Sequence, residues 1–404
     1  RRRRSLSTLF GFRMLTRPKP GWSHTSAWYV FFFLFAGAHL PFWPLWLKEW
    51  GLSEAEVGTY SAAAIATRVL LGVALPWIAD RLSAQRRMLA VLAIMMCVLY
   101  AAHFWIDTRP FLFAATLATA AVAAGMLPMA DALSLRAASQ NGFAYATARS
   151  VGSAAFLVAN IICGLAVARW GVDAALWWII LSFPPLVWLG LRHPGGAGTS
   201  VARPKLAEAW RLLKSPVFLA AMIAGAATQG SHAVLYAYGS IHWASQGIDD
   251  ATIGALWALG VAVEVALMAI WGKAVIDKLG AAGAILLAAA VGGFRWIIMT
   301  FDPALSWLWP LQALHGLTFT AAHLGVMAFV QAAAPPQLAA TAQGLTGALA
   351  GGVVMAGASF AAAWAYPAFG PGAYWIGVVL AVVGLIAAET MRRLWRGGQL
   401  SVST

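Results

Sequence analysis

The chain has 404 residues, of which 61% are hydrophobic and 10% are charged, and its formal net charge at pH 7 is +13. This composition, with a mean hydropathy of +0.75, excludes an ordinary soluble domain and is typical of an integral membrane protein.

Twelve apolar stretches are long enough to cross about 30 Å of hydrocarbon as helices. We expect spans at 27–47, 57–78, 88–105, 111–133, 146–168, 174–191, 217–238, 253–275, 281–300, 307–330, 342–365 and 373–390. With the N-terminus inside, the inner segments, together with Lys273 at the inner end of the eighth span, carry 21 of the 27 Lys and Arg residues, and the outer loops carry three. This positive-inside bias explains the basic charge without a nucleic-acid partner. It predicts a multi-pass protein of the cytoplasmic (inner) membrane with both termini in the cytoplasm.

An internal repeat occurs at half the chain length. Residues 51–58 (GLSEAEVG) align with 247–254 (GIDDATIG) at an offset of 196, and 78–82 (IADRL) align with 275–279 (VIDKL) at an offset of 197. Each copy predicts a helix start, with Ser53 or Asp249 as N-cap, followed by an apolar span and an acid–base pair. The repeat predicts an all-α fold of twelve transmembrane helices in two pseudo-symmetric six-helix bundles.

These patterns divide the chain into five segments. They are a basic cytoplasmic N-terminal segment (1–26), an N-terminal six-helix bundle (27–191), a cytoplasmic linker (192–214), a C-terminal six-helix bundle (215–390) and a cytoplasmic tail (391–404). The linker is marked by the polar run HPGGAGTS and by five basic residues. We expect no cleavable signal peptide in the first segment and a monomeric protein.

The acid–base pair of the repeat lies in a short basic inner loop. Its members are Asp80 and Arg81 after the second span, and Asp277 and Lys278 after the eighth. The first loop resembles the loop signature of the major facilitator superfamily, with Pro76 and Ser83 at positions where glycines are usual. The resemblance implies a twelve-helix transporter in which both loops switch conformation.

Asp131 and Arg149 lie 18 residues apart, near the inner ends of the fourth and fifth spans. The segment 145–152, YATARSVG, is similar to the Tyr-Gly-x-x-Arg-x-x-Gly region of the lactose permease-type proton symporters. That resemblance implies an ion pair between Asp131 and Arg149, with Arg149 also engaging the substrate. The alternative is a pair that only holds two helices together.

Glu264 lies near the middle of the eighth span, roughly 16 Å from one end at 1.5 Å per residue. A carboxylate at this depth needs a partner or a function. By the repeat, Glu264 aligns with Arg68 of the second span, so equivalent helices carry opposite charges at one depth.

Arg295 in the ninth span and His315 in the tenth lie in the same band of depth as Glu264, roughly 8 Å and 12 Å from their outer ends. The three residues resemble the proton-handling set of the lactose permease-type symporters. This implies proton coupling through Glu264, with Arg295 as its cation and His315 as an accessory. Thr318 stands where those permeases carry a second carboxylate. The alternative is an ion pair that ties the eighth span to the ninth.

The candidate substrate contacts, besides Arg149 and Asp131, are Arg68, His232, Tyr236 and Trp43. A guanidinium can hold a carboxylate and an aromatic face can cover a ring. The alternatives are that His232 is a hydrogen-bonded core residue and that Trp43 is a packing residue.

Across nearly all spans the chain is similar to the phenylpropionate permease-like branch of the superfamily, through LPFWP (40–44), ADAL (130–133), GVAVE (260–264) and LHG (314–316). The resemblance implies proton-coupled uptake of a small organic acid, with an aromatic monocarboxylate favoured. Alternatives are a sugar or nucleoside symporter, and a non-transporting membrane receptor or assembly factor. The expected partners are the substrate, protons and the bilayer.

A membrane-embedded enzyme would need a nucleophile or metal set. Cys97 and Cys163 lie inside spans and the histidines are scattered, so we expect no metal and no cofactor.

Overall fold

The computed structural model of the protein describes residues 19–72, 74–196, 206–335 and 338–400, and every regular element in these ranges is a helix. Residues 1–18, part of the predicted linker and the last four residues of the predicted tail lie outside the described ranges.

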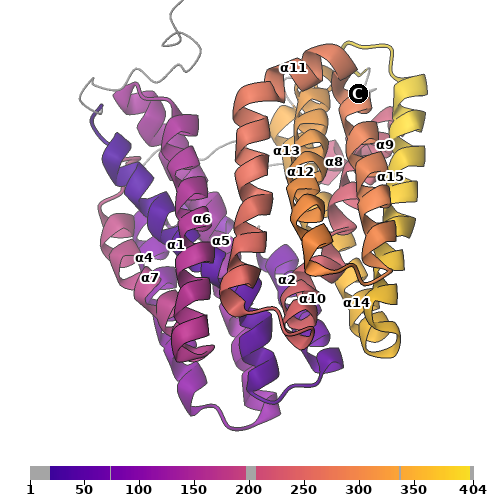
Figure 1. Cartoon of the computed structure of the whole chain (residues 1–404). Helices are drawn as coiled ribbons and strands as arrows, with labels where there is room; N and C mark the ends of the chain where they lie inside the picture. Colours follow the sequence, from indigo (N-terminus) through magenta and orange to yellow (C-terminus); the bar gives the residue numbers. More distant parts are fainter. Residues whose placement is uncertain (1–18, 73, 197–205, 336–337, 401–404) are drawn as a thin grey trace, which may run out of the picture.

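The helices gather in two bundles that follow one another along the chain (Figure 1). The first half contains α1 (Trp22–Glu49), α2 (Glu54–Leu71), α3 (Ala74–Arg81), α4 (Gln85–Ala102), the 3₁₀ turn η2 (His103–Trp105), α5 (Arg109–Asn141), α6 (Tyr145–Trp170) and α7 (Asp173–Leu191). The second half contains α8 (Leu206–Leu213), α9 (Pro216–Gly230), α10 (Ala233–Ser245), α11 (Asp250–Met299), α12 (Leu305–Ala333), α13 (Ala339–Ala348), the π-turn η4 (Leu349–Val353), α14 (Val354–Phe369), the 3₁₀ turn η5 (Gly370–Tyr374) and α15 (Trp375–Leu394).

The molecule has two ends. We call the end at which α1 starts and α15 finishes the terminal face; it lies at the top of Figure 1. The end at which α2 and α11 begin is the opposite face. α8 lies within the segment that the sequence predicted as a linker, so that segment contains helix as well as loop.

Ten stretches of the described chain are long and apolar enough to cross a membrane. Two of these stretches contain an interruption of the α-helix. α11 runs for 50 residues, but Gly280 inside it has φ 66° and ψ 177°, which is not helical. The stretch Val354–Leu394 contains η5.

Three predicted spans are interrupted where the sequence analysis expected continuous helix. In the second span α2 ends at Leu71, Gly72 forms a turn and α3 begins at Ala74, with residue 73 outside the described ranges. This break is explained by Pro76, which cannot donate to the carbonyl four residues earlier and is tolerated only in the first turn of a helix. The seventh span divides between α9 and α10 at Ser231 and His232, and the eleventh contains η4.

The internal repeat is reproduced in backbone geometry. Ser53 accepts a hydrogen bond from the Glu56 backbone N–H, and Asp249 accepts one from the Thr252 N–H at 3.0 Å, so both predicted N-caps are confirmed. Ser83 and Gly280, which the 197-residue offset also aligns, have φ angles of 50° and 66°. This left-handed region suits glycine and is unfavourable for serine.

The two halves pack closely at the opposite face. A Cβ on Gly254 of α11 would lie 2.3 Å from the Asn160 carbonyl oxygen of α6, and one on Gly58 of α2 would lie 2.7 Å from the Ala363 Cβ of α14. The Tyr238 hydroxyl of α10 donates to the Glu54 carbonyl of α2 at 2.8 Å. These contacts bring helices of both halves together at this face.

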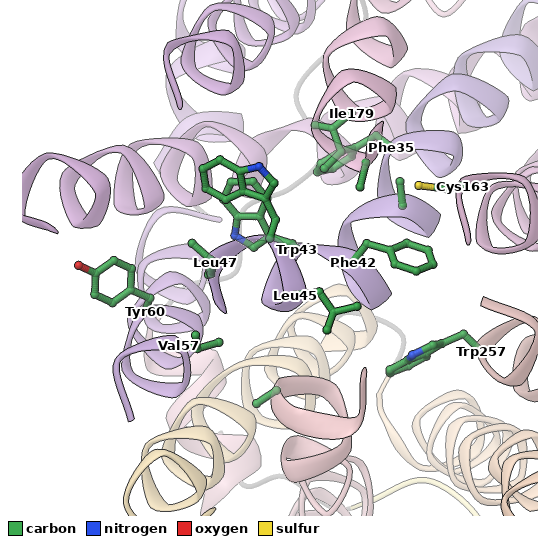
Figure 2. Close-up of a cluster of buried hydrophobic side chains, with 14 of the residues drawn as sticks. Phe35, Phe42, Trp43, Leu45, Leu47, Val57, Tyr60, Cys163, Ile179 and Trp257 are labelled. Atoms are coloured by element: carbon green, nitrogen blue, oxygen red, sulfur yellow. The ribbon is translucent and has the colours of Figure 1, made fainter. Parts of the chain in front are cut away.

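A hydrophobic cluster continues this contact into the protein (Figure 2). Phe42 and Trp43 of α1, Cys163 of α6 and Trp257 of α11 are among its buried members, so side chains of both halves share one core. The structure is therefore closed at the opposite face.

Candidate functional site

Glu264 lies fifteen residues after the N-cap of α11 (249 to 264) and is half-buried. α12 fixes its backbone. A Cβ on Gly316 would lie 2.5 Å from the Glu264 nitrogen, and the Thr320 hydroxyl donates to the Glu264 carbonyl at 3.2 Å. Among the described residues, no side chain lies within hydrogen-bond or ion-pair distance of its carboxylate. Contacts with α12 therefore hold the backbone of Glu264 in place, while its carboxylate has no side-chain partner among the described residues.

The cation whose field reaches the Glu264 carboxylate is Arg149 of α6, in the other half. The Arg149 guanidinium lies over the rings of Phe33, at 4.2 Å, and Tyr29, at 5.2 Å, both on α1. Cation–π contacts of this kind hold a guanidinium without neutralising it. The rings of Phe33 and Tyr29 thus form an aromatic seat that holds Arg149 in the first half, and its charge acts on Glu264 in the second half.

Asp131 of α5 is held by two tyrosines. Its Oδ1 accepts a hydrogen bond from the Tyr29 hydroxyl at 2.6 Å and from the Tyr145 hydroxyl at 2.9 Å. The predicted contact ion pair with Arg149 is not formed, although the charge of Arg149 acts on Asp131 at longer range. The aromatic seat of Arg149 and the two phenol donors explain why the charges do not meet. Two carboxylates, Asp131 and Glu264, therefore share one arginine.

Tyr29 was not found by sequence analysis, because it lies in an aromatic run, WYVFFF (28–33), that has no polar pattern.

Arg295 of α11 lies in a separate, fully buried cluster. Its Nη2 donates to Gln312 Oε1, its Nη1 lies 3.4 Å from His315 Nδ1, and the guanidinium carbon lies 4.4 Å from the centre of the Trp296 ring. The predicted pairing of Arg295 with Glu264 is therefore absent. Gln312, one helical turn before His315 on α12, was missed because a neutral amide gave no charge signal.

His232, Tyr236 and Trp43 occupy different environments. His232 is buried, with Nε2 3.1 Å from Thr318 Oγ1 and Nδ1 3.1 Å from the Gln229 carbonyl, an environment of the kind that the core alternative describes. Trp43 stacks on Trp46 at 4.9 Å and is 6% exposed, so it also packs in the core. Tyr236 is half-buried.

Arg68 of α2 is exposed, and the groups that feel its charge are His39 and Tyr100. In the predicted switch loops, Arg81 is exposed and the side chain of Asp80 lies outside the described residues. Asp277 pairs with Lys273 at 2.5 Å rather than with its neighbour Lys278.

Comparison with known proteins gives consistent relatives. The sequence pattern of the MFS_1 like family matches residues 22–376. The "Probable 3-phenylpropionic acid transporter" of Escherichia coli (strain K12) is 28% identical over 362 residues, which are 88% of this chain and 93% of that protein. The "Uncharacterized transporter YwbF" of Bacillus subtilis (strain 168) is 24% identical over 80% of this chain and 81% of that protein.

Two solved structures illustrate the similarity in fold. The nucleoside transporter NupG superposes with a TM-score of 0.75 at 15% identity, covering 93% of this chain and 99% of NupG. The POT family transporter PepTSo superposes with a TM-score of 0.68 at 13% identity, covering 93% and 96% of the two chains. At these identities the similarity shows the fold alone.

Proposed function

The chain belongs to the MFS_1 like family of multi-pass membrane transporters, and from this premise we propose that it carries a small aromatic monocarboxylate together with protons by alternating access. The relative named for 3-phenylpropionic acid supports the substrate class.

We propose that α11 and the stretch Val354–Leu394 each cross the membrane twice, which gives twelve spans in two pseudo-symmetric bundles. The non-helical Gly280 supports the first division and η5 supports the second. The positive-inside pattern favours a cytoplasmic terminal face in the inner membrane. On this orientation the closed opposite face would be the outer one, so we assign the structure to the inward-facing state of such a carrier.

The observation that carries proton coupling is the placement of Glu264 and Arg149 in different halves. In alternating access the two halves rock against each other around a central site. The distance between the Glu264 carboxylate and the Arg149 guanidinium then changes with conformation, and so does the stability of the ionised carboxylate. Glu264 would bind a proton in one state and release it in the other.

Arg149 has a second acid, Asp131, within its field. When the two halves rock against each other, Asp131 stays with Arg149 because both belong to the first half, whereas the distance from Glu264 to Arg149 changes because Glu264 belongs to the second. We assign Asp131, Tyr29 and Tyr145 to holding this arginine in place, and Glu264 to the proton.

The test is uptake into proteoliposomes under an imposed pH gradient, with labelled 3-phenylpropionate, uridine and lactose side by side. The proposal predicts that only 3-phenylpropionate accumulates above equilibrium and that a protonophore abolishes the accumulation. Gradient-driven uptake of uridine or lactose instead would support the nucleoside or sugar alternative. No uptake of any of the three would contradict the proposal.

A further inference from the structure

We propose that Arg68, together with the aromatic group that contains His39 and Tyr100, is the site in the first half that holds the carboxylate of an aromatic substrate. This inference rests on the proposed function and specifies where the anion binds. None of the sequence motifs distinguished Arg68 from the other two arginines as a carboxylate ligand.

The charges within the spans do not balance. Besides Lys273 and Glu389, which pair with residues outside the spans, the predicted spans carry three arginines, Arg68, Arg149 and Arg295, against two carboxylates, Asp131 and Glu264. With both acids ionised, one positive charge is unmatched in the interior, where an isolated charge is costly. One monocarboxylate would neutralise it.

The three arginines differ in their partners. Both acids lie in the field of Arg149. Arg295 is fully buried and is already held by Gln312, His315 and Trp296, so a ligand has no access to it in this state. Arg68 is exposed and, among the described residues, forms no hydrogen bond and no ion pair. Unlike Arg149, it has no acid among the groups with which its charge interacts.

Arg68 projects from the side of α2 that faces the protein. Leu70, 77% exposed, lies on the most exposed side of α2. Two residues along a helix turn by about 200°, so Arg68 projects from the other side. Ile65, about 60° around the helix from Arg68, packs beside the Met355 cluster of α14. The charge of Arg68 also acts on His39 of α1 and Tyr100 of α4.

His39 and Tyr100 belong to one connected group of aromatic rings. His39 stacks on Trp43 at 5.6 Å, Tyr100 lies 6.1 Å from His39, and His103 stacks on Tyr100 at 5.6 Å. Of these rings His39 is the half-buried one, at the accessible end of the group. The buried His103 Nε2 has no hydrogen-bond partner among the described residues.

An arginine without an acidic partner, whose charge acts on members of an aromatic group, suits an aromatic acid. The planar guanidinium of Arg68 can donate two parallel hydrogen bonds to a carboxylate. The ring of the substrate would then lie against His39, with offset or edge contact as aromatic pairs prefer. A sugar would leave the charge of Arg68 unmatched.

The experiment compares 3-phenylpropionate with its uncharged amide, 3-phenylpropionamide, by the dissociation constants for the purified full-length protein in lipid nanodiscs. The two probes share the ring and differ in charge. We expect the wild type to prefer the acid at least tenfold, Arg68→Gln to remove this preference while still binding the amide, and Arg68→Lys to restore part of it. Retained amide binding shows that the variant is folded.

A control variant makes the test specific. Arg169→Gln removes the same charge from an exposed position at the end of α6 and should keep the full preference. A preference that survives in Arg68→Gln, or that is lost equally in Arg169→Gln, would overturn the assignment of Arg68 and leave the proposed function standing. Wild-type protein that binds neither probe would overturn both.

Discussion

Arg68 and Glu264 each lie fifteen residues after the N-cap of their helix, Ser53 for α2 and Asp249 for α11 (53 to 68 and 249 to 264). The two halves therefore present opposite charges at the same helical register. In the account proposed above, one half contributes the cation that binds the substrate anion and the other contributes the acid that carries the proton.

This register predicts the pseudo-symmetry directly. When residues of the first half are superposed on those of the second in an experimental structure, the Cα atoms of Arg68 and Glu264 should lie within one helical turn, about 5.4 Å. A larger separation would show that the repeat does not extend to these residues.

The repeat also places Ser83 where the second half has Gly280, and both have positive φ. A non-glycine residue in this region costs roughly 1–2 kcal/mol, which is partly offset by the greater flexibility of glycine in the unfolded chain. We expect Ser83→Gly to raise the thermal unfolding temperature slightly and Gly280→Ala to lower it, as measured by tryptophan fluorescence on heating. Opposite signs would contradict the equivalence.

The contact between α6 and α11 at Gly254 should control closure of the opposite face. A methyl group there would meet the Asn160 carbonyl oxygen at 2.3 Å, so Gly254→Ala should push the two helices apart. Buried Cys163 on α6 is a native probe of this opening. In a Cys97→Ser background we expect faster maleimide labelling of Cys163.

The matched control is Gly357→Ala, since a Cβ on Gly357 meets no atom within 4 Å. Its labelling rate should equal that of the parent. Equal rates for Gly254→Ala and the parent would show that this contact does not hold the face closed.

The buried Arg295 cluster should be sensitive to Gln312. Gln312→Leu removes the acceptor of a charged donor, and a hydrogen bond to a charged group contributes about 1.5–3 kcal/mol. Gln312→Glu supplies an acid to a cation that has none among its described contacts. We expect the Leu variant to lower the unfolding temperature markedly and the Glu variant to lower it less or to raise it. A harmless Leu substitution would show that Arg295 does not depend on this amide.

Exchanging Asp131 and Arg149 should preserve insertion and abolish transport. An arginine at 131 cannot accept hydrogen bonds from Tyr29 and Tyr145, and an aspartate at 149 cannot occupy the aromatic seat beside Phe33. Expression is checked by size-exclusion profile and transport by uptake of 3-phenylpropionate. Wild-type uptake in the exchanged protein would mean that these two positions only hold helices together.

The sequence predicted the helical class, the N-caps and the repeat because these depend on local patterns of apolar and capping residues. It also identified Asp131, Arg149 and Glu264 as charges within the membrane spans. It did not predict which of them meet, because depth along a helix does not determine the direction of a side chain. Arg295 and Glu264 share a band of depth and yet contact different neighbours.

The sequence also did not predict the neutral residues that hydrogen-bond to the charged groups. Tyr29 and Gln312 satisfy charged groups, but nothing in their surroundings in the sequence distinguishes them from ordinary residues of an apolar span. The breaks at residues 72–74 and 231–232 were also missed, since Gly and Pro are tolerated in membrane helices and hydropathy alone reads through them.

The central claim is that Glu264 carries the proton, and Glu264→Gln tests it most directly because glutamine keeps the shape but cannot titrate. In proteoliposomes the account predicts that this variant loses accumulation of 3-phenylpropionate driven by a pH gradient. It should still exchange labelled for unlabelled substrate, since exchange requires reorientation with substrate bound and no net proton movement. Accumulation at the wild-type level with an unchanged pH dependence would contradict the account and remove Glu264 from the coupling mechanism.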